Sequence, residues 1–439
     1  MKISRIEIKG LYGAYSYEIT ELQCQNLMLL TGYNGMGKTT ILNIIKNIAD
    51  SNLWYFYNLT FDEICISFEG GLALKMSFVN VEKTVTKTYS EDSDGNVVPE
   101  KYLKYEWFKD GDSLCSVKIN RRSFYKAVTV LLQVAYVPED DDTWIPLMKN
   151  RMKDIVSFIS KRQNAMSLDM IQSSVKAFMI PAQRVRQLRL STSYEEDKFP
   201  FIQTEPEEID TIEVVAESFG KLLEQKRIEF LKSIQSSKNG LMDRLLNADT
   251  EDIGKSKYEE LAINVQEKID DLSQFGIAFE KIRPYNHDNG KLLSAYLLEL
   301  RDTLEKYSGL LIDLKLFASI LNKKHFLHKT ISFSPDYGFK AFNDNGASID
   351  SSKLSSGEQN IIILLYQIIF EVQNGTILLI DEPEISMHVV WLKEFIKDLQ
   401  EIAKNKQDVQ IMIATHSPQI VSGAIDNCFD LEMNNVYGK

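Results

Sequence analysis

Two carboxylates at the end of an apolar segment suggest metal-assisted phosphate chemistry. Residues 376–380 read Thr-Ile-Leu-Leu-Ile and are followed by Asp381 and Glu382. A buried strand can end in two charges when a partner compensates them, and a magnesium ion is such a partner. We therefore expect Asp381 to hold Mg²⁺ and Glu382 to accept a proton from an attacking water as general base.

A glycine-rich segment provides the matching phosphate site. Residues 32–39 read Gly-Tyr-Asn-Gly-Met-Gly-Lys-Thr, the full phosphate-loop pattern, between an apolar strand and a helix. Its glycines let backbone N–H groups face phosphates, and the helix N-terminus adds its dipole. Lys38 would pair with the β- and γ-phosphates, and Thr39 would place its hydroxyl on Mg²⁺. The expected cofactors are ATP and Mg²⁺, and the expected nucleotide-binding residues are Asn34, Gly35, Gly37, Lys38, Thr39 and Thr40.

A serine-glycine segment, residues 354–359, ends 22 residues before Asp381. Ser355, Ser356 and Gly357 precede the apolar helix expected over 361–370. Hydroxyls and free N–H groups at a helix N-terminus form an anion site. With Glu358 the same residues also read as a capping box, so only their position upstream of Asp381 makes them informative.

Two further apolar segments end in polar residues. Residues 411–414 are followed by Thr-His-Ser-Pro, which places His416 to donate to a γ-phosphate; a structural histidine is the alternative. Residues 178–180 lead to Gln183, placed to reach Mg²⁺ or the attacking water. The arginines that follow form either a solvated basic loop or a contact to phosphate, nucleic acid or an acidic partner: Arg184, Arg186 and Arg189.

Alternating polar and apolar residues predict three successive hairpins between residues 62 and 120. Their turns are expected at Gly70-Gly71, at residues 94–96 and at Asp110-Gly111. Three hairpins in succession predict an antiparallel lobe. Residues 357–439 alternate helix and strand, as in a parallel sheet.

Residues 205–325 are expected to be largely helical. The leucine-rich positions from Leu293 to Leu321 alternate spacings of four and three, which predicts a coiled-coil seam of four heptads. Such a seam would extend about 40 Å, with a helix over 258–280 as its partner. Packing in an ordinary helical bundle is the open alternative.

Composition and net charge argue against several classes of protein. The chain has 439 residues, 44% of them hydrophobic, and a formal net charge of -12. No apolar run is long enough to span a bilayer, and the scattered cysteines favour neither a disulfide framework nor a zinc site, so we expect a cytoplasmic protein without membrane contact. The net charge argues against a DNA-coating surface, although residues 120–190 carry twelve Lys or Arg against six Asp or Glu.

Together these motifs resemble the ABC-type ATPase heads of the SMC-like group. They are most similar to single-chain ATPases related to OLD-family proteins of prokaryotic phage defence, which share the sequence Asp-Glu-Pro-Glu followed by His, here residues 381–388. The resemblance implies an α/β P-loop ATPase head, a mixed sheet with an antiparallel β lobe, and a helical insertion forming a short coiled-coil arm. The implied parts are the N-terminal half of the head over 1–190, the arm over 191–329 and the C-terminal half over 330–439.

The resemblance also implies an assembly. Ser355 and Gly357 of one subunit would contact the γ-phosphate bound by Lys38 of another, giving a homodimer or higher homo-oligomer with composite ATP sites. No motif fixes the aromatic side chain that stacks on adenine, and Tyr12 and Tyr15 are the candidates.

Three functions follow as alternatives. An OLD-type nuclease would continue into a TOPRIM domain, but only 23 residues follow His416, fewer than a domain of about 50 residues needs. We therefore expect an ATPase that senses a viral trigger and controls a separate effector, such as a TOPRIM-like or HNH-like nuclease, as in PARIS-type or Septu-type systems. The alternatives are an SMC-like DNA repair or chromosome-maintenance ATPase that binds nucleic acid, and an ATP-bound scaffold with negligible turnover.

Overall fold

The protein folds into two compact units. The computed structural model describes residues 1–20, 22, 26–80, 89–91, 97–99, 101–132, 151–163, 174–189, 207–246, 251–324, 326 and 328–435. Unit 1 comprises Met1–Gln183, Leu188–Glu207 and Val372–Lys439, and unit 2 comprises Arg184–Gln187 and Glu208–Glu371. The division of the chain into 1–190, 191–329 and 330–439 stays a prediction.

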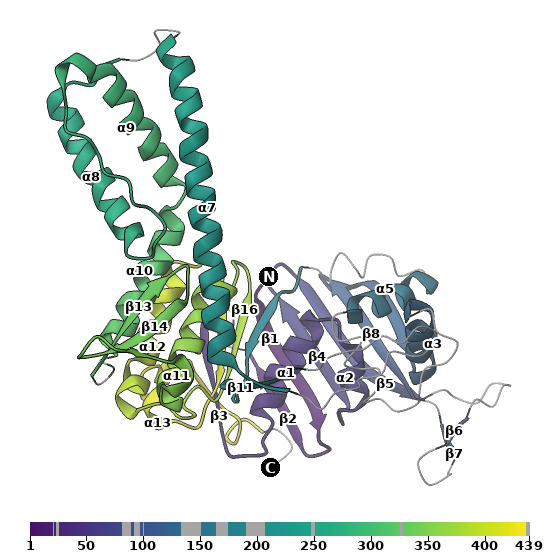
Figure 1. The fold of residues 1–439 in the computed structure, drawn as a ribbon. Helices are drawn as coiled ribbons and strands as arrows, with labels where there is room; N and C mark the ends of the chain where they lie inside the picture. The colour runs from purple at the N-terminus through teal and green to yellow at the C-terminus, as the bar shows by residue number, and fades with distance from the viewer. Residues whose placement is uncertain are drawn as a thin grey trace. The chain divides into compact units, whose positions relative to one another are not determined.

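Unit 1 contains a six-stranded antiparallel sheet in the order β2-β1-β4-β5-β8-β9 (Figure 1). Every second residue of β4 is buried, which is the period expected for a strand with one face on the core. The first and third expected hairpins are confirmed, but the second forms a separate two-stranded sheet. The strands are β1 (Ile3–Leu11), β2 (Tyr15–Ile19), β4 (Glu63–Phe68), β5 (Leu72–Asn80), β6 (Tyr89–Glu91), β7 (Val97–Pro99), β8 (Lys101–Lys109) and β9 (Asp112–Ile119).

A second sheet in unit 1 is parallel throughout, in the order β10-β16-β17-β3-β18. All residues of β16 and β17 are buried, which matches their uninterrupted apolar sequences. The expected α/β class with an antiparallel lobe is thus confirmed, with two separate sheets rather than one mixed sheet. The strands are β3 (Leu27–Thr31), β10 (Ala177–Ile180), β16 (Ile377–Asp381), β17 (Gln410–Ala414) and β18 (Cys428–Asp430).

One hydrophobic core joins the two sheets and helix α1. A buried amide reinforces this junction: Gln410 accepts from the Ile3 backbone N–H at 2.8 Å and donates to the Ile3 carbonyl at 2.9 Å. Both the oxygen and the nitrogen of this side-chain amide therefore have a hydrogen-bond partner although they are buried. The described part of unit 1 contains the helices α1 (Lys38–Ala49), α2 (Leu53–Tyr57), α3 (Arg121–Leu132), α5 (Met152–Arg162), α12 (Val389–Lys404) and α13 (Pro418–Ser422).

Unit 2 combines a helical arm with a three-stranded antiparallel sheet, β13-β14-β15 (Figure 1). An aromatic cluster centred on Phe219 joins the arm to the sheet and to helix α11, with ring centroids 5.2–5.9 Å from Phe219. Its elements are α7 (Thr211–Leu246), α8 (Lys255–Ser273), α9 (Gly290–Glu305), α10 (Ser308–Lys323), β13 (Lys329–Ser334), β14 (Gly338–Asn343), β15 (Ser348–Ile349) and α11 (Ser356–Tyr366). The short β11 (Arg186–Arg189) and β12 (Glu207–Asp210) pair with each other.

The expected continuous seam from Leu293 to Leu321 is wrong because the helix breaks after Glu305. Lys306 and Tyr307 donate to carbonyls three residues back, which tightens the last turn of α9. The buried Tyr307 ring meets Phe230 of α7 edge-on at 5.5 Å. The helix expected over 258–280 is present as α8 but ends at Ser273, and it forms ion pairs with both α9 and α10. Its role as a coiled-coil partner stays a prediction. Across the described helices, none is both long and apolar enough to cross a membrane.

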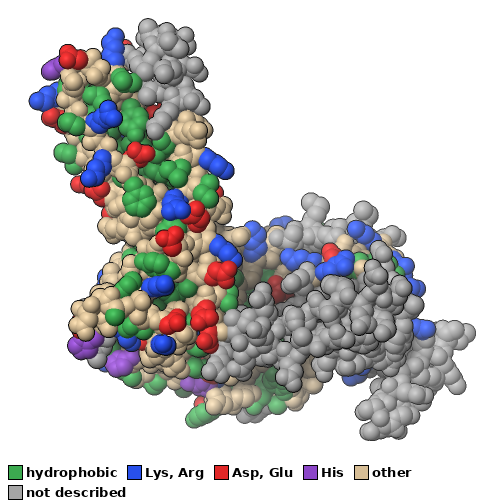
Figure 2. Space-filling model, in the orientation of Figure 1, with side chains coloured by type: hydrophobic (Ala, Val, Ile, Leu, Met, Phe, Trp, Pro, Cys, Tyr) green, Lys and Arg blue, Asp and Glu red, His purple; other side chains and the backbone are tan. Residues whose placement is uncertain are grey.

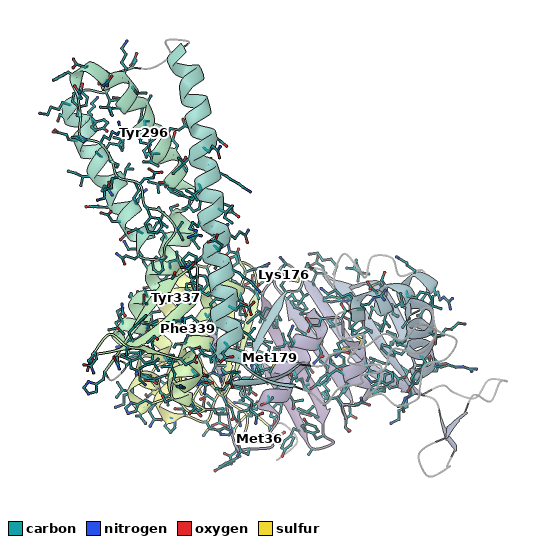
Figure 3. The ribbon with its side chains drawn as sticks, viewed as in Figure 1. Met36, Lys176, Met179, Tyr296, Tyr337 and Phe339 are labelled. Carbon is teal, nitrogen blue, oxygen red and sulfur yellow. The ribbon has the colours of Figure 1, made fainter. Side chains whose placement is uncertain are left out.

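The turn between β13 and β14 packs closely on α7, and Gly338 makes this possible (Figure 3, where Tyr337 and Phe339 flank it). Gly338 has φ +68°, and a Cβ there would lie 1.8 Å from the Ala216 carbonyl oxygen. Gly338→Ala should lower the free energy of unfolding by about 3 kcal/mol or more, measured by urea denaturation.

Gly346 is the matched control for that substitution. It has φ +76° in the turn between β14 and β15, but nothing lies within 4 Å of its Cβ position. Gly346→Ala should therefore show only the left-handed backbone cost of about 1 kcal/mol. Equal losses for the two variants would contradict the close packing on Ala216.

Candidate functional site

The parallel sheet brings four of the predicted segments to one edge. Since β3, β10, β16 and β17 all run in the same direction, their carboxyl ends lie together. The phosphate loop follows β3, the two carboxylates end β16, the His416 segment follows β17, and Gln183 follows β10. This edge is where ligands bind in open α/β sheets.

The phosphate loop adopts a conformation that its glycines permit. Gly32, Gly35 and Gly37 have φ of 133°, 86° and 90°. Asn34, Gly35 and Thr39 are exposed, whereas Gly37 and Lys38 are buried and Thr40 is intermediate. Backbone N–H groups at this helix start can face an anion.

Tyr17 supports the loop in a way that no sequence motif indicates. Its hydroxyl donates to the carbonyl of Met36 at 2.8 Å, and the Tyr17 side chain is buried. Met36 is labelled in Figure 3. Tyr17 lies on β2, so the antiparallel sheet helps to fix the loop that follows β3.

Lys38 is held inside the loop by its backbone. Its Nζ donates to the carbonyls of Gly32 at 2.9 Å and Tyr33 at 3.1 Å. Burial lowers the pKa of Lys38, and the nearby carboxylates of Glu382 and Asp381 oppose that effect. A phosphate would add negative charge at this position and strengthen the protonated form.

Thr39 and Asp381 fit a magnesium site. The Thr39 hydroxyl donates to both carboxylate oxygens of Asp381, at 2.9 and 3.1 Å. Oxygen atoms from a hydroxyl and a carboxylate, completed by substrate phosphates and water, are the ligands that Mg²⁺ prefers. Bound there, the ion would neutralise phosphate charge. Among the described residues, no group of three or more His, Cys, Asp or Glu forms a metal site by itself. Residues 139–142, Glu-Asp-Asp-Asp, whose sequence favours a solvated loop over a metal site, lie outside the described part of the chain.

Glu382 and His416 lie beside each other across the strand ends. The Glu382 Oε1 atom is 3.7 Å from the His416 Nε2 atom. The Glu382 backbone has φ 42°, a strained conformation for this residue type of the kind that clusters at functional sites. Its N–H donates to the Ala414 carbonyl at 2.9 Å, which extends the pairing of β16 with β17. The geometry allows one carboxylate and one imidazole to face the same reacting group.

The structure places Gln183 at the correct edge with an exposed side chain. Ile180, the last residue of β10, pairs with Ile380, so Gln183 follows the strand that lies beside β16. A role at Mg²⁺ or water stays a prediction. Arg184 is buried in unit 2, so a fully solvated loop is wrong for that residue.

The two adenine-stacking candidates have intramolecular partners. The Tyr12 hydroxyl is 2.6 Å from the Thr40 hydroxyl, and its ring is exposed. The Tyr15 ring stacks on Tyr17 with centroids 6.1 Å apart. Tyr12 therefore lies directly on the helix that begins in the phosphate loop, whereas Tyr15 supports Tyr17.

The serine-glycine segment belongs to unit 2 and caps helix α11. Ser355 is exposed at the N-cap position, and Glu358 completes the capping box by accepting from the Ser355 N–H at 2.8 Å. Lys329 donates to both Glu358 carboxylate oxygens at 2.8 Å. The capping box and an anion site are compatible, since the remaining N–H groups of the first turn have no partner within the helix.

The Lys329–Glu358 pair predicts an acid-sensitive unit 2. Burial alone would raise the Glu358 pKa, but hydrogen bonds from Lys329 and Ser355 bring it below its usual 4.5. The stability from this carboxylate is therefore present above pH 4.5 and is lost as pH falls through the lower folded-state pKa. Glu358→Gln should cost about 1–3 kcal/mol at pH 7, and urea denaturation should show that gap closing in acid.

Glu305→Gln is the control for this pH dependence. Glu305 pairs with Lys268 on the surface, with 66% of its side chain exposed. Exposed pairs contribute little, so this variant should track the wild type at every pH. A Glu358→Gln gap that persists in acid would contradict the ion-pair explanation.

Three of the solved structures that are similar to this chain are SMC heads. The SMC head bound to the C-terminal winged-helix domain of ScpA is 11% identical, with 97% of this chain and 92% of that chain covered and a TM-score of 0.36. The Pyrococcus furiosus SMC head with an extended coiled coil, bound to the C-terminal domain of ScpA, is 13% identical. The match covers 96% of this chain and 92% of that chain, with a TM-score of 0.32. The Thermotoga maritima SMC head is 12% identical, with 97% of this chain and 92% of that chain covered and a TM-score of 0.30. At these TM-scores the likeness carries no argument for function or assembly.

A family model gives the decisive comparison. No significant match was found among curated proteins. The model described as the AAA ATPase domain matches residues 1–421 and so covers both the phosphate loop and the Asp381–Glu382 strand end. The chain belongs to the AAA ATPase domain family and is an ATPase.

Proposed function

We propose that this ATPase is a sensor and regulatory subunit that uses ATP to control assembly with a separate effector. The observation that carries this proposal is the exposed Ser355 at the start of α11, held rigidly by Glu358 and Lys329. A fixed helix N-terminus open to solvent can receive the γ-phosphate held by Lys38 of a second subunit. ATP binding would then be a condition for association.

Each residue of the proposed ATP site has a specific role. Lys38 binds the β- and γ-phosphates, and Thr39 and Asp381 hold Mg²⁺. Glu382 accepts a proton from the attacking water, and His416 donates to the γ-phosphate. Asn34, Gly35, Gly37 and Thr40 contribute the loop, Ser355 and Gly357 complete the site from the partner, and Gln183 orients water or Mg²⁺.

Mixing two inactive variants tests the composite site. Lys38→Ala removes the phosphate ligand, and Ser355→Arg blocks the partner's signature. In a mixed dimer, one site contains an intact Lys38 and an intact Ser355, so partial hydrolysis should return. Activity that stays absent after mixing, with dimers present, would exclude a trans signature.

The resemblance to PARIS-type and Septu-type defence ATPases supports the effector part of the proposal. A viral component is the proposed trigger, and a nuclease of TOPRIM-like or HNH-like chemistry is the proposed effector. Co-purification with the product of the neighbouring gene should depend on nucleotide state. Retention that is equal with ATP, ADP and no nucleotide would contradict ATP-controlled assembly.

A nucleic-acid partner is a second candidate, because two helices of unit 1 carry mainly basic charged residues. Figure 2 shows Lys and Arg side chains over the end of unit 1 that carries α3 and α5. The two helices carry six Lys or Arg, all exposed, and one acid, Asp154. The six are Arg121, Arg122, Lys126, Lys153, Lys161 and Arg162.

Salt-dependent binding tests this second candidate. A labelled 30-base-pair duplex should bind at low salt, and Arg122→Glu with Lys126→Glu should weaken binding and reduce its salt dependence. Lys255→Glu with Lys257→Glu, on exposed positions of α8, is the charge-matched control. Absence of binding at low salt would exclude the nucleic-acid function.

A further inference from the structure

The loop after β16 contains a carboxylate, Glu384, to which the reaction assigns no role. Its Oε1 atom accepts from the Thr415 hydroxyl at 2.9 Å and from the His416 backbone N–H at 2.5 Å. Thr415 is fully buried, and its hydroxyl in turn accepts from the Ser417 N–H at 3.0 Å. One carboxylate oxygen therefore fixes three successive residues of the segment that carries His416.

The backbone between β16 and Glu384 directs this carboxylate back toward β17. Glu382 and Ser386 both have positive φ, 42° and 62°, within five residues. Hydrogen bonds from Ile385 to the Glu382 carbonyl and from Met387 to the Glu384 carbonyl, at 3.2 and 3.0 Å, close the turns. The loop is thus built around the position of Glu384.

The contacts of Glu384 lie next to the proposed reacting groups. His416 Nε2 is 3.7 Å from Glu382 Oε1, and that separation depends on where the His416 backbone is held. The second oxygen of Glu384, Oε2, is buried without a hydrogen-bond partner among the described residues. The interaction with Thr415 and His416 is therefore the polar anchor that the structure gives this side chain.

We infer that Glu384 is a positioning residue for ATP hydrolysis, which holds the His416 segment in register with Glu382. This inference rests on the proposed role of His416 at the γ-phosphate. Glu384 acts through the backbone N–H of His416 and the hydroxyl of Thr415. Its removal should lower kcat and leave ATP affinity unchanged, because positioning in the transition state matters more than ground-state binding.

A double-mutant cycle tests the inference. Glu384→Ala should lower kcat about tenfold or more at an unchanged Kd for ATP. Glu384→Ala combined with His416→Ala should be no slower than His416→Ala alone, because both changes remove the same function. Glu384→Gln retains an acceptor oxygen and should recover most of kcat. Multiplicative losses in the double variant would overturn the inference.

Hydrogen exchange provides a readout that does not depend on turnover. In Glu384→Ala the amide of His416 loses its acceptor and should exchange about tenfold faster, while the amides of β3 and α1 stay unchanged. Uniformly faster exchange across unit 1 would instead indicate a purely structural role and overturn the inference. Glu69→Ala, an exposed glutamate at the β4–β5 turn, is the control and should change neither kcat nor exchange.

The same variants separate this inference from the proposed site. If His416→Ala turns over ATP at the wild-type rate, the proposed role of His416 is wrong, and the positioning role of Glu384 fails with it. If His416→Ala is slow and Glu384→Ala is not, only the inference about Glu384 fails. The measured ATP affinity shows in each case whether the phosphate loop is intact.

Discussion

Glu382→Gln should reduce ATP turnover by about 10²- to 10⁴-fold, the usual contribution of a general base. The amide cannot take up a proton from water, but it has the size of the carboxylate and leaves Thr39 and Asp381 paired. ATP binding should therefore persist, and ATP-bound assemblies should accumulate. Steady-state hydrolysis, nucleotide binding and light scattering measure the three parts of this expectation.

Glu69→Gln is the matched control for this substitution. It makes the same chemical change at an exposed turn of the antiparallel sheet. It should hydrolyse ATP at the wild-type rate. Unchanged turnover in Glu382→Gln would exclude Glu382 as the base, whereas loss of binding would indicate that the carboxylate has a structural role in the loop.

Lys38→Ala should weaken ATP binding about 10- to 100-fold, the value of one hydrogen-bonded charge. The Lys38 ammonium is the buried cation at the centre of the phosphate loop, and its two backbone acceptors already fix its position. Isothermal titration calorimetry with ATP and Mg²⁺ measures the loss. Comparing hydrolysis in this variant and in the wild type also separates an active ATPase from a scaffold with negligible turnover.

Lys46→Ala controls for removing a lysine from the same helix. Lys46 lies in the last turn of α1 and pairs with Asp50 at 2.7 Å. Its removal should leave ATP affinity unchanged. Equal loss of affinity in both variants would indicate that α1 itself had been disturbed.

The main elements of the candidate site follow from sequence because parallel strands align their carboxyl ends. Apolar segments before Asp381 and His416 predict buried strands, and the glycines of the phosphate loop predict its positive φ values. Once the strands are parallel, the polar residues after them must share an edge. The local sequence pattern and the parallel direction of the strands together are sufficient to predict that these polar residues lie at one edge of the sheet.

The supporting contacts could not be predicted because they depend on residues far apart in the chain. Tyr17 meets Met36 across 19 positions, and Gln410 meets Ile3 across 407. Neither tyrosine nor glutamine in a strand marks such a partner. The break after Glu305 has a similar origin, since leucine spacing continues through it while buried Tyr307 packs on Phe230.

The position of β3 between β17 and β18 has a consequence for biosynthesis. Residues 27–31 emerge from the ribosome long before their hydrogen-bonded neighbours, which are residues 411–414 and 428–430. Until those segments are made, the nascent chain carries an apolar Leu-Met-Leu-Leu strand with both edges unpaired, a state prone to aggregation. Folding of the phosphate-loop strand is thus coupled to the translation of nearly four hundred further residues, and this interval is where a chaperone would be needed most.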